Sequence, residues 1–137
     1  WVISVDGIAS DIGDWLMNVT HGNLWAFLLI TNIILLIAGC VMDATSALYI
    51  FIPILLPVAT DMGYDTVAFG ILMCVNLAIG LVTPPVGVNL FTACSISKLT
   101  IKDTFKDVVP IIVSLIVVLL LVTYIPQISL LLPNLLN

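Results

Sequence analysis

The sequence predicts an all-α integral membrane protein made of a re-entrant helical hairpin, a transmembrane helix broken at a Pro-Pro pair, and a further transmembrane helix. Composition is the first reason: of the 137 residues, 62% are hydrophobic and 8% are charged, and the mean hydropathy is +1.32. So few charged side chains cannot cover a water-soluble domain of this size, so the bilayer is the expected solvent. The second reason is that glycines and prolines interrupt long apolar runs, which a regular helix rarely tolerates.

Charge and cysteine content exclude several other classes. The net charge of −5 argues against nucleic acid as a partner, because nucleic-acid binding needs a basic surface. The three cysteines, Cys40, Cys74 and Cys94, lie in apolar stretches without metal-ligand spacing, so we expect buried apolar side chains rather than disulfides or a zinc site. The chain starts at Trp1 and shows no basic segment before an apolar run, unlike a signal peptide. We therefore expect the C-terminal portion of a longer protein.

Residues 1–22 are predicted to lie at the membrane interface as a short amphipathic helix or loop. Apolar side chains recur there at helical spacing with aspartates between them, and Trp15 suits the level of the lipid headgroups. An ordinary loop outside the membrane is the alternative.

Residues 23–60 are predicted to form the hairpin. The run 24–59 contains 36 residues and one charge, Asp43. A single helix of that length would measure about 54 Å, whereas the hydrocarbon core is about 30 Å thick. The run must therefore break or fold back, and two arms too short to span comfortably predict a re-entrant hairpin with a polar tip at mid-membrane.

The break in the hairpin is expected at 39–46, where Gly39 loosens the first arm. Three polar residues of this stretch are candidates to cap the second arm: Asp43, Thr45 and Ser46. Two prolines, Pro53 and Pro57, are expected to disturb that second arm.

Residues 66–97 are predicted to form a discontinuous transmembrane helix that is broken at 80–89. Pro84 and Pro85 remove two backbone donors, and Pro85 pushes Pro84 out of helical geometry. A regular helix therefore cannot continue through this stretch.

The rest of the chain is predicted to contain a cytoplasmic loop and helix start at 98–107, a transmembrane helix at 108–126 and an interfacial tail at 127–137. The loop carries all three lysines: Lys98, Lys102 and Lys106. Positive charge favours the cytoplasmic side, so the hairpin opens to the outside and the C-terminus lies outside. This describes a multi-pass membrane protein.

Non-helical backbone at membrane depth is costly unless it lines a cavity or is buried in protein. Carbonyls freed at such a break can coordinate a small cation, and helix N-termini can face an anionic substrate. Thr83 and Asn89 add side-chain oxygens, which hard cations such as sodium prefer. The alternatives are that each break is a simple kink, that the Thr83 hydroxyl bonds back to its own helix, and that Asp43 is a helix cap rather than a ligand, or both.

At this point the residues resemble a known family. The segment from Gly80 to Phe91, with Thr83-Pro84-Pro85 inside it, is similar to the signature of the large membrane subunit of TRAP (tripartite ATP-independent periplasmic) transporters. The stretches 39–43 and 53–57 resemble the second hairpin of that subunit. The similarity is clearest from Asn32 to Pro133.

The resemblance implies one half of an inverted-repeat, elevator-type transporter that uses sodium as its coupling ion and needs no cofactor. It also implies two protein partners, a small membrane subunit and a periplasmic binding protein that delivers an organic acid such as a C4-dicarboxylate, sialic acid or a related sugar acid. Carried over from the family, one sodium site would use backbone oxygens of Gly39, Gly80 and Val86 together with Thr83. The family often has Met where Val86 stands, which a backbone ligand would survive.

The candidates at the hairpin tip and near the substrate are Asp43, Thr45, Ser46, Pro84, Pro85 and Asn89. Another sodium-coupled anion symporter with hairpins is an alternative, and a non-transporting assembly subunit is an alternative of another class. An enzyme is not expected, because intramembrane aspartyl proteolysis needs two membrane aspartates and this chain has one, Asp43. The sequence does not name the substrate.

Overall fold

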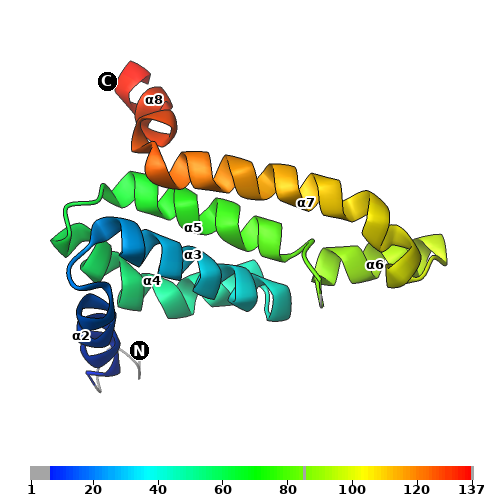
Figure 1. Cartoon of the computed structure of the whole chain (residues 1–137), viewed down its shortest axis with the longest axis horizontal. Coiled ribbons are helices and arrows are strands. Elements are labelled where there is room, and N and C mark those ends of the chain that lie inside the picture. Colours follow the sequence, from blue (N-terminus) through cyan, green and yellow to red (C-terminus); the bar gives the residue numbers. More distant parts are fainter. Residues whose placement is uncertain (1–6, 85, 137) are drawn as a thin grey trace.

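The computed structural model describes residues 7–84 and 86–136, and this part of the chain is helical without strands. Its helices are α2 (Ile8–Thr20), α3 (Leu24–Val41), α4 (Ala44–Asp61), α5 (Thr66–Gly80), α6 (Val88–Ser97), α7 (Ile101–Tyr124) and α8 (Pro126–Leu136). Helices α3, α4, α5, α6 and α7 run along the long axis of the molecule, whereas α2 and α8 cross this direction at one end (Figure 1).

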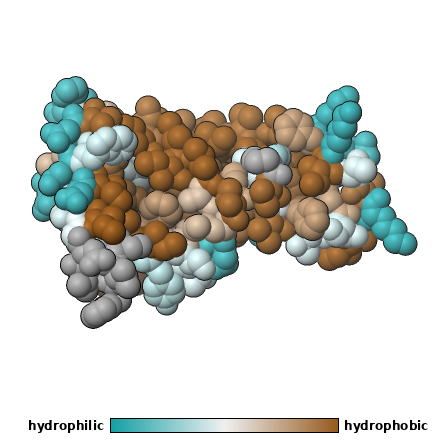
Figure 2. Space-filling model, turned by 90° about the horizontal axis from the view of Figure 1, so that it is seen from below, coloured by the Kyte–Doolittle hydropathy of each residue, from teal (hydrophilic) through white to brown (hydrophobic). Residues whose placement is uncertain are grey.

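On the face shown in Figure 2, the two ends of the long axis are hydrophilic and the surface between them is mostly hydrophobic. One end carries the turn between α6 and α7, with Lys98, and the first turns of α7, with Lys102 and Lys106. The other end carries α2, α8 and the loop between α4 and α5 (Figure 1). Among the described residues, three helices are long and apolar enough to cross a membrane, namely α3, α4 and α7. The chain is therefore an all-α membrane protein whose long axis suits the bilayer normal.

Helices α3 and α4 form an antiparallel pair joined by Met42 and Asp43. The turn lies near the middle of the long axis rather than at the lysine end (Figure 1). Each arm has 18 residues, about 27 Å at 1.5 Å per residue. The predicted shortness of the arms is therefore wrong, because each arm is nearly as long as the hydrocarbon core is thick.

The helix bounds also bear on two local expectations about the hairpin. Gly39 lies inside α3, which continues to Val41, so the break is narrower than the predicted stretch 39–46. Pro53 and Pro57 lie inside α4 without ending it. In a membrane bundle, neighbouring helices can satisfy the backbone groups that a proline frees, and α4 packs against α2, α3 and α5.

The second interruption separates α5, which ends at Gly80, from α6, which begins at Val88. The chain leaves α5 in a tighter turn, because the amide of Val82 donates to the Ile79 carbonyl (3.1 Å) and that of Thr83 donates to the Gly80 carbonyl (3.0 Å). This interruption lies at nearly the same level of the long axis as the α3–α4 turn (Figure 1). Pro85, one of the predicted breakers, lies outside the described residues.

Helix α7 begins within the predicted loop 98–107, because Thr100 caps it by accepting from the Asp103 amide (3.3 Å). The predicted tail is helical as well: α8 starts at Pro126, whose ring suits the first position of a helix.

The core lies mainly between α3 and α5, which run side by side in the same direction. Phe27 and Phe69 stack with ring centroids 6.4 Å apart, and Leu35, Leu72 and Leu77 of the same two helices are fully buried. This packing fixes the relative height of the two helices, and it brings the end of α3 against the end of α5.

Candidate functional site

Gly39 of α3 and Gly80 of α5 bring two helix backbones into direct contact. A Cβ atom added to Gly80 would lie 2.7 Å from both the Cα and the carbonyl carbon of Gly39, and one added to Gly39 would lie 3.0 Å from the Leu77 carbonyl oxygen. Neither position has room for a side chain. The structure therefore brings together two of the residues predicted for the sodium site, Gly39 and Gly80.

A backbone hydrogen bond also joins the end of α3 to the interruption. The Gly87 amide donates to the Cys40 carbonyl oxygen (3.2 Å), and the Cys40 thiol lies 3.9 Å from the Pro84 carbonyl oxygen, which accepts from it. Sequence reasoning assigned Cys40 only a packing role and missed this contact. The carbonyl concerned belongs to the last turn of α3, where intrahelical donors run out, but its partner could not be read from the sequence.

Thr83 is half-buried, and its hydroxyl donates to the Ile79 carbonyl oxygen one turn earlier (2.7 Å). This is the back-bonded arrangement weighed as an alternative to a ligand role. A hydroxyl that donates its proton still has lone pairs to offer, so the bond to Ile79 and cation binding are compatible.

The carbonyls around the interruption are partly engaged. The Gly80 carbonyl accepts from Thr83, and the Leu81 carbonyl accepts from the Asn89 amide (3.1 Å). In the last turn of α3, the Ala38 carbonyl accepts from Met42. Since a carbonyl oxygen has two lone pairs, Gly80 retains one for a further partner, and the Gly39 carbonyl has no following intrahelical donor. Val86, whose carbonyl was also predicted as a ligand, is exposed.

Asp43 is the N-cap of α4. Its carboxylate accepts from the Ser46 amide (3.1 Å) and lies 3.5 Å from the Ser46 hydroxyl, whereas the Thr45 side chain is exposed. Helix α6 differs, because it follows Gly87, which has no side chain to cap it. Of the two helix N-termini at mid-depth, one already holds a carboxylate and the other is left without a side-chain cap. The exposed Asn89 belongs to the first turn of that second helix.

Sequence reasoning missed a buried polar network between α3, α5 and α7. The Asn76 amide group donates to the Asn32 backbone carbonyl (3.1 Å) and side-chain oxygen (2.8 Å), and the Asn32 amide group donates to the Thr123 hydroxyl (3.0 Å). The Tyr64 hydroxyl donates to the Thr123 carbonyl (2.8 Å). The available signal was two asparagines isolated within apolar runs, since such side chains need partners in a membrane.

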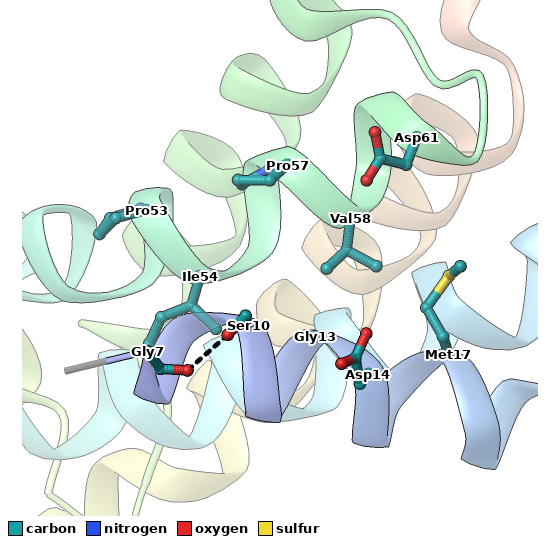
Figure 3. A pocket seen from close by; sticks show the side chains of 10 residues that line it. All are labelled: Gly7, Ser10, Gly13, Asp14, Met17, Pro53, Ile54, Pro57, Val58 and Asp61. Carbon is teal, nitrogen blue, oxygen red and sulfur yellow. Dashed lines mark hydrogen bonds between the residues drawn. The ribbon is translucent and has the colours of Figure 1, made fainter. Parts of the chain in front are cut away.

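A separate cavity of about 380 Å³ lies between α2 and α4. Asp14 and Asp61 line it together with Gly13, Met17 and Pro57 (Figure 3). Helix α2, one of its two walls, lies at the end of the long axis opposite the turn between α6 and α7 (Figure 1). Among the described residues, no group of three or more His, Cys, Asp or Glu side chains could hold a metal ion.

The family is decided by comparison with known proteins. The profile of the family described as "Tripartite ATP-independent periplasmic transporter, DctM component" matches residues 1–128. This chain belongs to that family, the TRAP transporter large permeases. The profile covers both interruptions described above, so the Gly39–Gly80 contact lies within the family's own region.

Relatives among TRAP permeases span several substrates. The C4-dicarboxylate TRAP transporter large permease protein DctM of Rhodobacter capsulatus is 43% identical over 137 residues, all of this chain and 31% of the relative. The isethionate TRAP transporter permease protein DctMQ of Oleidesulfovibrio alaskensis is 43% identical over 94% of the chain and 20% of its own length. The sialic acid TRAP transporter large permease protein SiaM of Vibrio cholerae is 33% identical over 98% of the chain and 31% of its length.

These matches cover nearly all of this chain, but the chain spans only about a third of the length of DctM and of SiaM. Its relatives are transporter permeases rather than enzymes. The apolar helices agree with a multi-pass membrane protein.

Proposed function

We propose that this chain is part of the membrane permease of a sodium-coupled secondary transporter that imports an organic acid delivered by a periplasmic binding protein. The observation that carries the proposal is the backbone contact between Gly39, in the last turn of α3, and Gly80, at the end of α5. The α3–α4 turn and the α5–α6 interruption follow these residues closely, and both lie near the middle of the long axis (Figure 1). Discontinuous helices meeting near the midplane are how secondary transporters build their binding sites.

The proposed topology places the lysine end in the cytoplasm of a bacterium, with the protein in the inner membrane. The three lysines support this orientation through the positive-inside rule. Helices α3 and α4 then enter and leave from the periplasmic side as a re-entrant hairpin, and α2 and α8 lie near the periplasmic interface. The position of the α3–α4 turn near the middle of the long axis supports re-entry (Figure 1).

The proposed sodium shell combines backbone oxygens of Gly39, Gly80 and Val86 with the Thr83 hydroxyl. Gly39 and Gly80 lie in contact, and each has a carbonyl able to take a further partner. An ion held between them would connect the hairpin turn to the interruption, which would couple sodium binding to closure of the hairpin.

The proposed place for a substrate carboxylate is the N-terminus of α6. A helix N-terminus favours anions through its free N–H groups and the helix dipole, and that of α4 is already occupied by Asp43. Asn89 stands in the first turn of α6. Relatives named for C4-dicarboxylates, isethionate and sialic acid all carry anions, and they support an organic acid as the substrate class.

The remaining parts of the proposed transporter lie outside this chain. They are the other inverted repeat of the permease, a small membrane subunit and the periplasmic binding protein, with the repeats moving in an elevator-like manner. The one-third coverage of relatives supports the need for further permease sequence.

The test uses the full-length permease with its small subunit, reconstituted in liposomes, with the binding protein and a radiolabelled dicarboxylate or sialic acid outside. Uptake should require an inward sodium gradient and the binding protein, and potassium should not replace sodium. If every tested acid were taken up equally well with and without a sodium gradient, sodium coupling would be rejected. A correctly folded complex that transports none of the acids that its binding protein binds would favour an assembly subunit instead.

A further inference from the structure

The short chain between α5 and α6 folds around Gly87. The Asn89 amide donates to the Leu81 carbonyl (3.1 Å), which closes a loop containing Gly87, and the Phe91 amide donates to the Gly87 carbonyl (2.8 Å) as the first bond of α6. From this loop the Gly87 amide donates to another element, and its acceptor is the Cys40 carbonyl oxygen at the end of α3 (3.2 Å).

Only a residue without a side chain suits this position. Gly87 has φ of 47°, in the left-handed region that disfavours other residues. A Cβ atom there would also lie 3.0 Å from the Thr83 carbonyl oxygen and 3.3 Å from the Leu81 carbonyl oxygen. A larger residue would therefore have to shift the loop or turn the amide away from α3.

The bond made by Gly87 is next to the predicted sodium ligands on both sides. Its acceptor, Cys40, follows Gly39 directly, and the Cys40 amide nitrogen lies 3.1 Å from a Cβ built on Gly80. The Cys40 thiol meets the Pro84 carbonyl on the same loop. Both contacts hold the last turn of α3 to the interruption.

We infer that Gly87 is a positioning residue, whose backbone N–H holds the end of α3 against the broken helix and so presets the spacing between Gly39 and Gly80. This inference deepens the proposed function and rests on it where sodium is concerned. If an ion binds only when both segments are in place, its apparent affinity is the intrinsic affinity multiplied by the fraction of molecules in which they are in place. Loss of the Gly87–Cys40 bond therefore weakens sodium binding without removing a sodium ligand.

Cys40 provides a direct readout of this contact, because it is 6% exposed in the closed arrangement. In the full-length complex, Cys74, Cys94 and any further cysteines are replaced by alanine, and the rate at which N-ethylmaleimide modifies Cys40 is measured by mass spectrometry. Gly87→Ala should speed modification about tenfold, as expected for the backbone conformation it disfavours. Gly70→Ala is the matched control, because a Cβ at Gly70 meets nothing within 4 Å.

A second variant separates the backbone conformation from general damage. Asparagine adopts the left-handed region more readily than alanine, so Gly87→Asn should speed modification of Cys40 less than Gly87→Ala does. The order wild type, Gly87→Asn, Gly87→Ala supports the inference. Modification rates that do not change in Gly87→Ala would overturn it.

Sodium dependence of uptake is measured on the same variants. Gly87→Ala should raise the sodium concentration for half-maximal uptake about tenfold, and Gly70→Ala should leave it unchanged. If Cys40 becomes reactive in Gly87→Ala but wild-type uptake never needs sodium, the contact stands and the sodium proposal fails. If wild-type uptake needs sodium and Gly87→Ala changes neither its sodium dependence nor Cys40 reactivity, the role of Gly87 fails and the sodium proposal survives.

Discussion

At the scale of single residues, Thr83 has two uses for one hydroxyl group. The proton is given to the Ile79 carbonyl, and the oxygen remains free to accept a cation. Thr83→Val keeps the shape of the side chain but removes this oxygen. We expect it to raise the sodium concentration for half-maximal uptake about tenfold, equivalent to about 1.4 kcal/mol.

The control for Thr83 is Thr83→Ser, which retains the hydroxyl and should keep sodium dependence close to that of the wild type. Both variants should be compared at equal amounts of folded permease in the liposomes. A Thr83→Val variant that folds normally and keeps wild-type sodium dependence would leave Thr83 with its bond to Ile79 alone.

At Gly80, the addition of a single methyl group would disrupt the packing of α3 against α5. In Gly80→Ala the new methyl group would lie 2.7 Å from the backbone of Gly39, and a backbone inside a helix cannot rotate away as a side chain can. We expect a loss of about 1–3 kcal/mol in stability, typical of overpacking, seen as a lower thermal midpoint of the full-length permease in detergent.

Gly70→Ala is the matched substitution in the same helix. With open space around it, the added methyl group should stabilise α5 by about 0.5–1 kcal/mol, because glycine is the poorer helix former. If the two variants melted at the same temperature, the close approach of α3 and α5 would be refuted.

At the scale of elements, the start of α4 depends on the Asp43 side chain. Asp43→Ala removes the acceptor for the Ser46 amide and should destabilise the protein by about 1 kcal/mol. Asp43→Asn keeps a capping oxygen but loses the charge, so it separates the cap from a charged ligand. We expect Asp43→Asn to retain sodium-dependent uptake, measured in the same liposome assay, and near-normal stability. Loss of uptake in a stable Asp43→Asn protein would instead assign the charge to the transport site.

The junction between the start of α5 and the end of α7 is expected to respond to alkaline pH. Burial, with a smaller contribution from the Asp65 carboxylate, raises the pKa of Tyr64 to about 12, and its hydroxyl donates to the Thr123 carbonyl. The folded protein thus keeps this proton when the unfolded chain, with an ordinary tyrosine pKa of about 10, has lost it. The stabilisation is complete below about pH 10 and is lost as pH rises through about 12.

The measurement for Tyr64 is the thermal midpoint of the detergent-solubilised permease between pH 8 and pH 12, a range that spans about two units on each side of the ordinary tyrosine pKa of about 10. The wild type should lose more stability over the upper part of this range than Tyr64→Phe, which has no phenolic proton there. Parallel pH curves for the two proteins would show that the Tyr64 hydroxyl contributes nothing to the junction.

At the scale of the whole molecule, the two polar ends should lie on opposite sides of the membrane. In the full-length permease freed of its own cysteines, single cysteines replace Asp61 or Lys98. Intact cells are then treated with a thiol reagent that crosses the outer membrane but not the inner membrane. Position 61 should react and position 98 should not, because positive charge favours the cytoplasmic side. Reaction at position 98 alone would invert the topology and turn the hairpin toward the cytoplasm.

Local chemistry in the sequence was sufficient to predict the helical membrane class and the position of the interruption after Gly80. Low charge and long apolar runs require the bilayer as solvent, and a Pro-Pro pair removes backbone donors whatever surrounds it. The cap at Thr100 is local in the same way, since its partner Asp103 is three residues away. The role of the predicted sodium ligands stays a prediction.

Only the tertiary structure decided which residues far apart in the chain come into contact. Gly39 was predicted to break α3 but lies inside it, because a glycine in a helix can serve either as a weak point or as a place of close approach, and its partner Gly80 decides for the second. The prolines of α4 were predicted to disturb a helix that continues through both. The Asn32–Asn76 pair and the Gly87–Cys40 bond each join separate helices, so no local pattern reveals them: their energies come from burial and donor–acceptor matching, which exist only once the helices are packed.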